Sequence, residues 1–169
     1  WQGGEGHFVA KLKKQGGEDA FSAGAFPSSR REENLPAEAA RFWEDTFTAP
    51  PTGIPCVLQD KVFLLPHGLP DLTGMTVLRR GIEVGVLRKG RMEPSHHLFQ
   101  CCDRESLVRS LDLSPDDPRL SQFLKGQTIP CPPEWKGYAG VFVEGIPLGF
   151  GKASGGVLKN HYPKGLREY

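Results

Sequence analysis

The chain has 169 residues, with 21 Lys and Arg against 20 Asp and Glu, so its formal net charge is +1. This length suits one ordinary domain or two small ones, and such a chain buries about 70% of its unfolded surface. The balanced charge excludes attraction of polyanions by the average charge, so any such contact has to come from local clusters of basic residues.

The first third of the chain predicts a linker and one helix. Residues 7–12 form a short apolar run that its pattern alone does not separate from a loop. Residues 15–35 combine paired glycines with mixed charges and lack an apolar period, which is typical of a linker. A helix is expected over residues 36–47, capped near Asn34 and ended by two prolines. Its apolar face, which we expect to pack on the following domain, comprises Ala39, Ala40, Trp43 and Phe47.

Short strands and two brief helices are expected next. The β-type runs are residues 56–58, 61–65, 76–79 and 82–87, and helix starts are indicated over 94–99 and 114–124. Glu144-Gly145 lies between two apolar runs and is a two-residue hairpin signal. Pro147 places the second of these runs at an edge or a bulge. The pattern predicts an α+β fold with a small barrel or half-barrel.

The search for catalytic or metal-binding residues predicts none in this chain. Cys56 and Cys131 each follow a proline but lie beside no glycine-rich cofactor turn. His97 and Cys101 are four residues apart, yet the spacing is not that of a zinc site and further ligands are unspecified. The four cysteines are too few and too irregular for a disulfide scaffold, and no apolar run is long enough to span a membrane. We therefore expect structural, reduced cysteines in a cytoplasmic protein without a membrane partner.

The last nineteen residues predict a surface that faces a polyanion. Four cations there oppose only Glu168, while glycines would let backbone N–H groups approach a phosphate and Tyr162 offers a ring for stacking. The candidate RNA contacts in this stretch are Lys152, Lys159, Lys164 and Arg167 for phosphates, Asn160 and His161 for polar contacts, and Tyr162 for stacking.

A second basic cluster precedes the helix start at Ser95. Arg88, Lys89 and Arg91 would reach a turn, and the N-terminus of the next helix would add free N–H groups, which together make an anion site. The alternative is that Glu93 pairs with an arginine and Ser95 only caps the helix. Neither role excludes the other.

Three parts of the chain, near its start, in its middle and at its end, resemble a known family. At the end, residues 143–152, 155–156 and 158–167 are similar to the carboxyl end of RsmF-like members of the Sun/Fmu family, and in the middle residues 85–96 extend the match. Residues 4–12 resemble the segment with which the methyltransferase domain of that family ends. These proteins are S-adenosylmethionine-dependent RNA cytosine-C5 methyltransferases, in which a Rossmann-like catalytic domain precedes a PUA-like RNA-binding region.

The resemblance implies a domain organisation and a function. Residues 1–14 would be the last strand of a truncated methyltransferase domain, 15–35 a linker, 36–113 a helix and a first β-rich subdomain, and 114–169 a PUA-like subdomain. S-adenosylmethionine and the catalytic cysteines would belong to the upstream domain, with no cofactor in this chain. The expected role is docking of rRNA, or less readily tRNA, for that domain. The alternatives are a scaffold whose basic tail contacts the upstream domain, and an independent enzyme.

Overall fold

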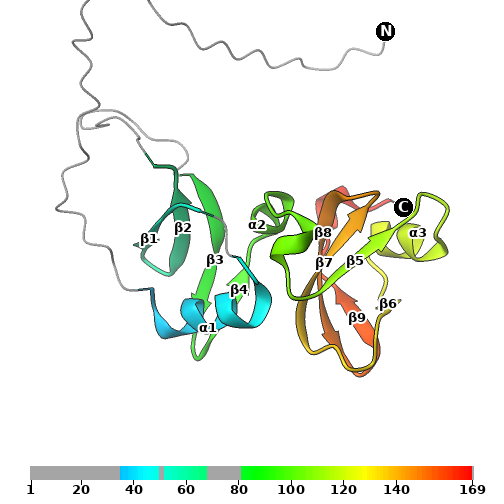
Figure 1. Cartoon of the computed structure of the whole chain (residues 1–169), viewed down its shortest axis with the longest axis horizontal. Helices are drawn as coiled ribbons and strands as arrows, with labels where there is room; N and C mark the ends of the chain where they lie inside the picture. The colour runs from blue at the N-terminus through cyan, green and yellow to red at the C-terminus, as the bar shows by residue number, and fades with distance from the viewer. Residues whose placement is uncertain (1–34, 50–51, 68–80, 169) are drawn as a thin grey trace, which may run out of the picture.

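The computed structural model describes residues 35–49, 52–67 and 81–168. The predicted strands at 7–12 and 76–79, Asn34 and nearly all of the linker lie outside these residues. The described residues form two β-sheets with three short α-helices (Figure 1). The elements are α1 (Ala37–Thr46), β1 (Ile54–Leu58), β2 (Lys61–Leu65), β3 (Ile82–Arg88), β4 (Arg91–Pro94), α2 (His96–Gln100), η1 (Arg104–Ser106), β5 (Ser110–Leu113), α3 (Pro118–Leu124), β6 (Ile129–Pro130), β7 (Gly137–Val143), β8 (Ile146–Ser154), β9 (Val157–Asn160) and η2 (Lys164–Leu166).

The first sheet is antiparallel, with strand order β1-β2-β3-β4. The predicted strands in this part of the chain are confirmed apart from their ends. β4 was not predicted, because a four-residue strand that ends in Pro94 directly before a helix carries little pattern of its own. It pairs with β3 through a tight turn in which Gly90 has a φ of 73°.

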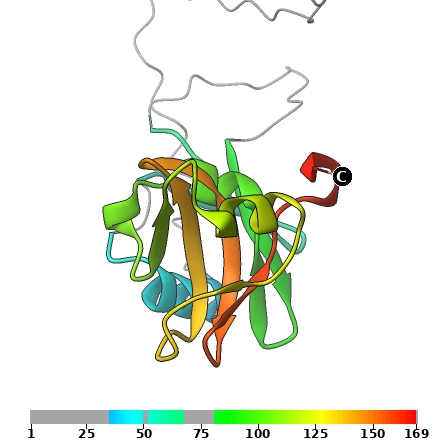
Figure 2. The same cartoon turned by 90° about the vertical axis from the view of Figure 1, so that its right-hand side faces the viewer.

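The second sheet is mixed, with order β5-β7-β8-β9-β6 and β5 parallel to β7 (Figure 2). The predicted Glu144-Gly145 hairpin is confirmed: both residues have positive φ, 50° and 79°, as a type I′ turn requires. The register between β7 and β8 shifts where Val141 faces Gly149 and Phe142 faces Pro147, so Pro147 does lie at a bulge. This curled sheet and the few helices confirm the predicted α+β half-barrel class.

Two helices differ from expectation in detail. α1 is confirmed, but Pro36 occupies its N-cap position without a side-chain hydrogen bond, and its buried face consists of Ala39, Phe42 and Thr46, with Trp43 half-buried. The third helix begins at Pro118 and not at residue 114. Asp117 caps it by accepting a hydrogen bond from the Arg119 N–H at 2.9 Å, and the side-chain hydrogen bond from Arg119 lowers the pKa of Asp117.

The two sheets share a hydrophobic core. The second sheet packs one face on α3 and, with its other face, contributes Phe142 and Phe150 to the cluster that holds α1, α2 and the first sheet. Phe150 stacks on Phe99 of α2, with ring centroids 4.3 Å apart. A backbone bridge between Phe47 and Leu107 ties the end of α1 to the segment that leads into β5. None of the helices in the described part of the chain is long and apolar enough to cross a membrane.

Candidate nucleic-acid interface

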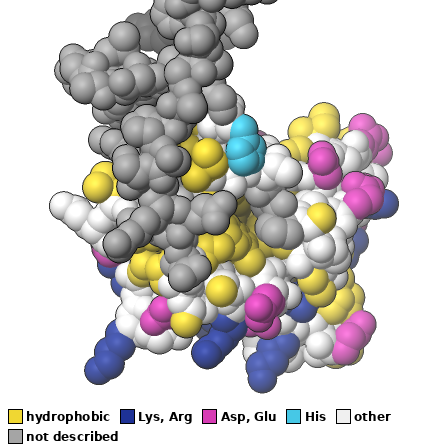
Figure 3. All heavy atoms as spheres, turned by 60° about the vertical axis from the view of Figure 1, so that its left-hand side comes forward, with side chains coloured by type: hydrophobic (Ala, Val, Ile, Leu, Met, Phe, Trp, Pro, Cys, Tyr) yellow, Lys and Arg dark blue, Asp and Glu magenta, His cyan; other side chains and the backbone are white. Residues whose placement is uncertain are grey.

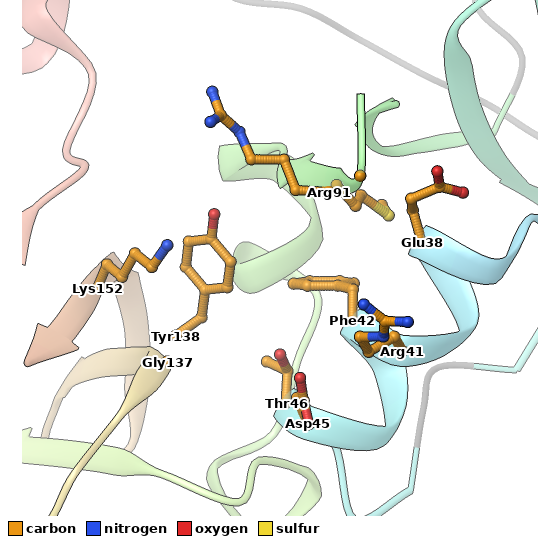
Figure 4. A pocket seen from close by; sticks show the side chains of 11 residues that line it. Glu38, Arg41, Phe42, Asp45, Thr46, Arg91, Gly137, Tyr138 and Lys152 are labelled. Atoms are coloured by element: carbon orange, nitrogen blue, oxygen red, sulfur yellow. The ribbon is translucent and has the colours of Figure 1, made fainter. Parts of the chain in front are cut away.

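A pocket lined by three basic and two acidic side chains lies where α1, the β3–β4 turn and the strands β7 and β8 meet. Its volume is about 170 Å³, and Figure 4 shows Arg91, Lys152 and Tyr138 around it. Arg109 holds the walls together, because its guanidinium donates to the carbonyl oxygens of Asp45 on α1 and Tyr138 on β7. The lining residues are Glu38, Arg41, Phe42, Asp45, Thr46, Gly90, Arg91, Met92, Gly137, Tyr138 and Lys152.

Two of the predicted lysines lie side by side on the second sheet. Lys152 faces Lys159 across β8 and β9, and Tyr138 faces Lys152 across β7 and β8, so the three side chains share one face of the sheet. The Lys152 ammonium lies 5.4 Å from the centre of the Tyr138 ring, within range of a cation–π contact. Neither lysine forms an ion pair within the described residues. Their charges are therefore available to a ligand.

His161 and Tyr162 lie in different surroundings. Tyr162 is partly buried, with its ring 5.7 Å from Phe123 and 5.8 Å from His96, so it belongs to the core. His161 is exposed, and its ring lies on Phe150 with centroids 5.1 Å apart and planes 23° from parallel. Contact of its inner face with Phe150 desolvates the imidazole and, together with the charge of Lys152, lowers the pKa of His161.

Asn160 and Arg167 hold the end of the chain in place. The Asn160 amide donates to the carbonyl oxygens of Phe123 at 2.8 Å and Gln127 at 3.1 Å, and its oxygen accepts from the Tyr162 N–H at 2.7 Å. The Arg167 guanidinium donates twice to the Tyr162 carbonyl, at 3.2 and 3.0 Å, and lies against Gly126. Both side chains are therefore engaged in hydrogen bonds within the fold.

Lys164 lies apart from the other predicted lysines. It opens the C-terminal turn η2, which lies at the opposite end of β8 and β9 from the Gly155-Gly156 turn (Figures 1 and 2). That end of the molecule also holds the last turn of α3, where the Glu168 N–H donates to the Leu124 carbonyl at 3.2 Å. The structure therefore divides the basic residues of the C-terminal stretch between two sites.

The glycines of the C-terminal stretch shape the second sheet and do not form a flexible phosphate loop. Gly155 and Gly156 make the β8–β9 turn with φ of 57° and 81°. Gly151 is buried, and a Cβ there would lie 2.6 Å from both Leu158 Cγ and the Lys159 oxygen. The strand β9 was not recognised from the sequence. A Gly-Gly turn between alternating residues was the signal that could have found it.

In the second basic cluster, that of Arg88, Lys89 and Arg91, the expected alternative is observed: Glu93 pairs with arginines and Ser95 caps the helix. Glu93 pairs with Arg91 at 2.6 Å and Arg88 at 3.4 Å, and the hydrogen bond from Arg91 is the main reason why the pKa of Glu93 is lowered. Arg88 also pairs with Asp60 at 2.9 Å. Ser95 accepts from the His97 N–H at 3.3 Å and so caps α2, which has only five residues. The turn nevertheless brings Arg91 to the pocket of Lys152, sixty residues away in the chain. On the face shown in Figure 3, several Lys and Arg side chains project from the lower edge, the end that holds this turn.

Two of the cysteines lie in surroundings that disfavour the thiolate form. Cys102 is buried, its thiol donates to the Leu98 carbonyl at 3.0 Å, and burial raises its pKa to about 12. Desolvation also raises the pKa of Cys131. Among the described residues, no group of three or more His, Cys, Asp or Glu side chains could hold a metal ion. Cys101 is the C-cap residue of α2 and lies just beyond the helix that holds His97.

Sequence reasoning missed Arg41 and Tyr138, both of which line the pocket. Arg41 is on α1 and Tyr138 on β7, and each belongs to a segment where the sequence pattern indicated only packing. Their meeting depends on the contact of α1 with β7, which no local pattern encodes.

Comparison with known proteins agrees with this architecture. Residues 41–100 match the family model described as "RsmF rRNA methyltransferase first C-terminal domain", and residues 110–168 match the "Methyltransferase RsmF PUA domain". The chain is 28% identical over 178 residues to a protein of Shewanella baltica strain OS155, and 27% identical over 179 residues to one of Shewanella sp. strain MR-4, both named "Ribosomal RNA small subunit methyltransferase F". These alignments cover 96% of this chain but 35% and 36% of the relatives, so the chain spans about a third of their length. With two consecutive domains of one methyltransferase matched in order, the chain belongs to the RsmF family and corresponds to its C-terminal region.

Proposed function

We propose that this chain is the RNA-binding C-terminal region of an S-adenosylmethionine-dependent rRNA cytosine-C5 methyltransferase, and that it docks ribosomal RNA for an upstream catalytic domain. The family match supports an RNA ligand, and the names of the relatives support ribosomal RNA of the small subunit. The catalytic residues and the methyl donor belong to the upstream domain in this proposal. This chain contributes affinity for the RNA and positions the RNA for the upstream domain.

One observation carries the proposal. Lys152 and Lys159 lie opposite each other on neighbouring strands, without an acidic partner among the described residues, and Arg91 reaches the same pocket as Lys152 from the other sheet. Two like charges held side by side repel each other, which the fold alone does not require. A phosphate backbone that passes over them relieves this repulsion and releases counterions. We place the RNA backbone along Lys152, Lys159 and the β3–β4 turn with Lys89 and Arg91.

The test is binding of the chain to ribosomal RNA hairpins, a tRNA and a matched DNA, measured by fluorescence anisotropy at two salt concentrations. We expect salt-sensitive binding that prefers rRNA, and a Lys152→Glu/Lys159→Glu variant with weaker binding. Each lost phosphate contact should lower the log–log salt slope by about 0.7 on single strands. The matched control is Lys125→Glu/Lys164→Glu, which changes the charge equally at the other end of the strands. An equal loss of RNA affinity in both variants would contradict the proposed placement of the RNA.

A scaffolding role is the second candidate, because an acid-free pair of lysines would equally suit an acidic protein surface. Binding of the chain to the isolated methyltransferase domain of a relative, without RNA and with loss in the Lys152→Glu/Lys159→Glu variant, would favour it. Absence of binding to every RNA tested would also move the interpretation to this candidate.

A further inference from the structure

Three aromatic rings form a continuous stack from the core to the surface. The Phe99 and Phe150 rings lie 4.3 Å apart with planes 14° from parallel, and the Phe150 and His161 rings lie 5.1 Å apart at 23°. Phe99 and Phe150 are only 1% and 2% exposed, whereas His161 is exposed. The outer ring therefore rests on a rigid base and turns its other face away from the core.

The position of His161 is fixed by its backbone and by the residues next to it. Its backbone N–H donates to the Phe150 carbonyl at 3.1 Å. The residue before it, Asn160, makes three hydrogen bonds, and the residue after it, Tyr162, is packed in the core. The rings of Tyr138 and His161 are also in contact, in a T-shaped arrangement with centroids 6.0 Å apart and planes at 79°. A ring held in this way loses little entropy when a ligand covers it.

The surroundings of the ring are basic. Lys152 lies over Tyr138, which touches His161, and Lys159 is next to Lys152 on the same face of the sheet. The lowered pKa of His161 favours the neutral imidazole, whose π-face suits stacking on another ring. Its ring nitrogens have no hydrogen-bond partner within the described part of the chain.

We propose that His161 is a stacking platform for an unpaired nucleobase of the bound RNA, with Lys152 and Lys159 holding the phosphates beside it. A flat aromatic face next to a row of cations is the combination that binds single-stranded nucleic acid. Double-stranded RNA would leave the platform empty, because its bases are stacked on one another. The inference rests on the proposed RNA binding and adds to it the form of the ligand: a loop or a single-stranded segment.

The experiment uses short single-stranded oligoribonucleotides that carry a fluorescent adenine analogue at one position after another. Stacking on an aromatic ring quenches this fluorescence, so we expect quenching by the wild-type chain at one or two neighbouring positions. His161→Ala should abolish the quenching and weaken binding about five- to tenfold, whereas His161→Phe should keep both. His97→Ala is the matched control, because His97 is an exposed histidine on α2, and it should leave both unchanged.

The outcomes separate this inference from the proposed function. Binding and quenching that persist in His161→Ala overturn the platform but leave RNA docking intact. A wild-type chain that binds neither these oligonucleotides nor the rRNA hairpins overturns the docking function and the platform with it. Since His161 is exposed, the fold of His161→Ala is checked by its unfolding midpoint, which should match that of His97→Ala.

Discussion

The rings of Phe99 on α2 and Phe150 on β8 stack with their centroids 4.3 Å apart. Phe99 lies in the stretch that matches the first C-terminal domain of the family, and Phe150 in the stretch that matches the PUA domain. The two stretches therefore meet in one core and are expected to unfold together.

Phe150→Ala should lower the free energy of unfolding by about 3–5 kcal/mol, because it opens a cavity in that shared core. Trp43 packs against the cluster that holds α1, α2 and the first sheet, and Trp135 packs against the cluster between the second sheet and α3. Urea unfolding followed separately at these two tryptophans should give the same shifted midpoint. Phe150→Leu is the control and should lower the free energy of unfolding by less. A shift seen at only one tryptophan would contradict the single cooperative unit.

Asn160→Ala should destabilise the chain by about 1–3 kcal/mol, because it removes hydrogen bonds to Phe123 and Gln127 and the acceptor for the Tyr162 N–H. Lys159→Ala, at the exposed neighbouring position, should have almost no effect on the urea midpoint. If Asn160→Ala instead lowered RNA affinity at full stability, Asn160 would be a direct contact, as its sequence context had suggested.

Gly126→Ala should destabilise the chain by about 1–2 kcal/mol, because Gly126 has a φ of 79°, a conformation that disfavours a side chain. The added methyl group would also meet the Arg167 guanidinium and loosen its hold on Tyr162. Gly165→Ala is the matched control, since a Cβ at that position meets nothing within 4 Å. Equal melting temperatures of the two variants would show that the Arg167 contact contributes nothing.

Stability should fall as the pH is lowered through 6.5, the ordinary pKa of histidine. Desolvation lowers the pKa of His96, and both of its ring nitrogens are buried without a partner among the described residues, so the folded state disfavours its protonation. The unfolded chain takes up the proton first, so this contribution to stability is complete above pH 6.5 and is lost below it. His96→Phe should flatten this slope in urea unfolding. His97→Phe should keep most of it, because desolvation is the main cause of the lowered His96 pKa and the charge of His97 is the smaller one.

Glu93→Gln should tighten RNA binding at low salt. The substitution frees Arg91 from its ion pair, removes one of the two acidic partners of Arg88, and removes a negative charge that acts on Tyr138 and His161. The pair is exposed, so the urea midpoint should change little. Asp60→Asn, which removes the other acidic partner of Arg88 and leaves the Arg91–Glu93 pair intact, is the comparison and should have the smaller effect. Unchanged affinity in Glu93→Gln would place the RNA away from the β3–β4 turn.

The local features of the fold could be predicted from the sequence. Glu144-Gly145 fixes its turn through two positive φ angles, and Ser95 caps α2 within two residues of itself. In contrast, β5 pairs with β7 in parallel, between residues thirty positions apart, and β6 pairs with β9 through only two residues. Pairings of this kind are decided by packing, which no short window of the sequence contains.

The candidate site was predicted in part. The family resemblance and the lysines indicated the C-terminal stretch, and Lys152 and Lys159 do share a face. The distinction between His161 and Tyr162 depends on which neighbour lies beneath each ring, and both neighbours, Phe150 and Phe123, come from other elements. Adjacent aromatic residues at the end of a strand are therefore ambiguous until the sheet is known.

The shared core also limits how this region can be inherited. A gene fusion that transferred only residues 110–168 would leave Phe142 and Phe150, now 1% and 2% exposed, without the helices that cover them. Such a product would carry an adhesive apolar face and would be removed by proteolysis or would associate with itself. We therefore expect the two stretches to be inherited together, although each matches its own family model.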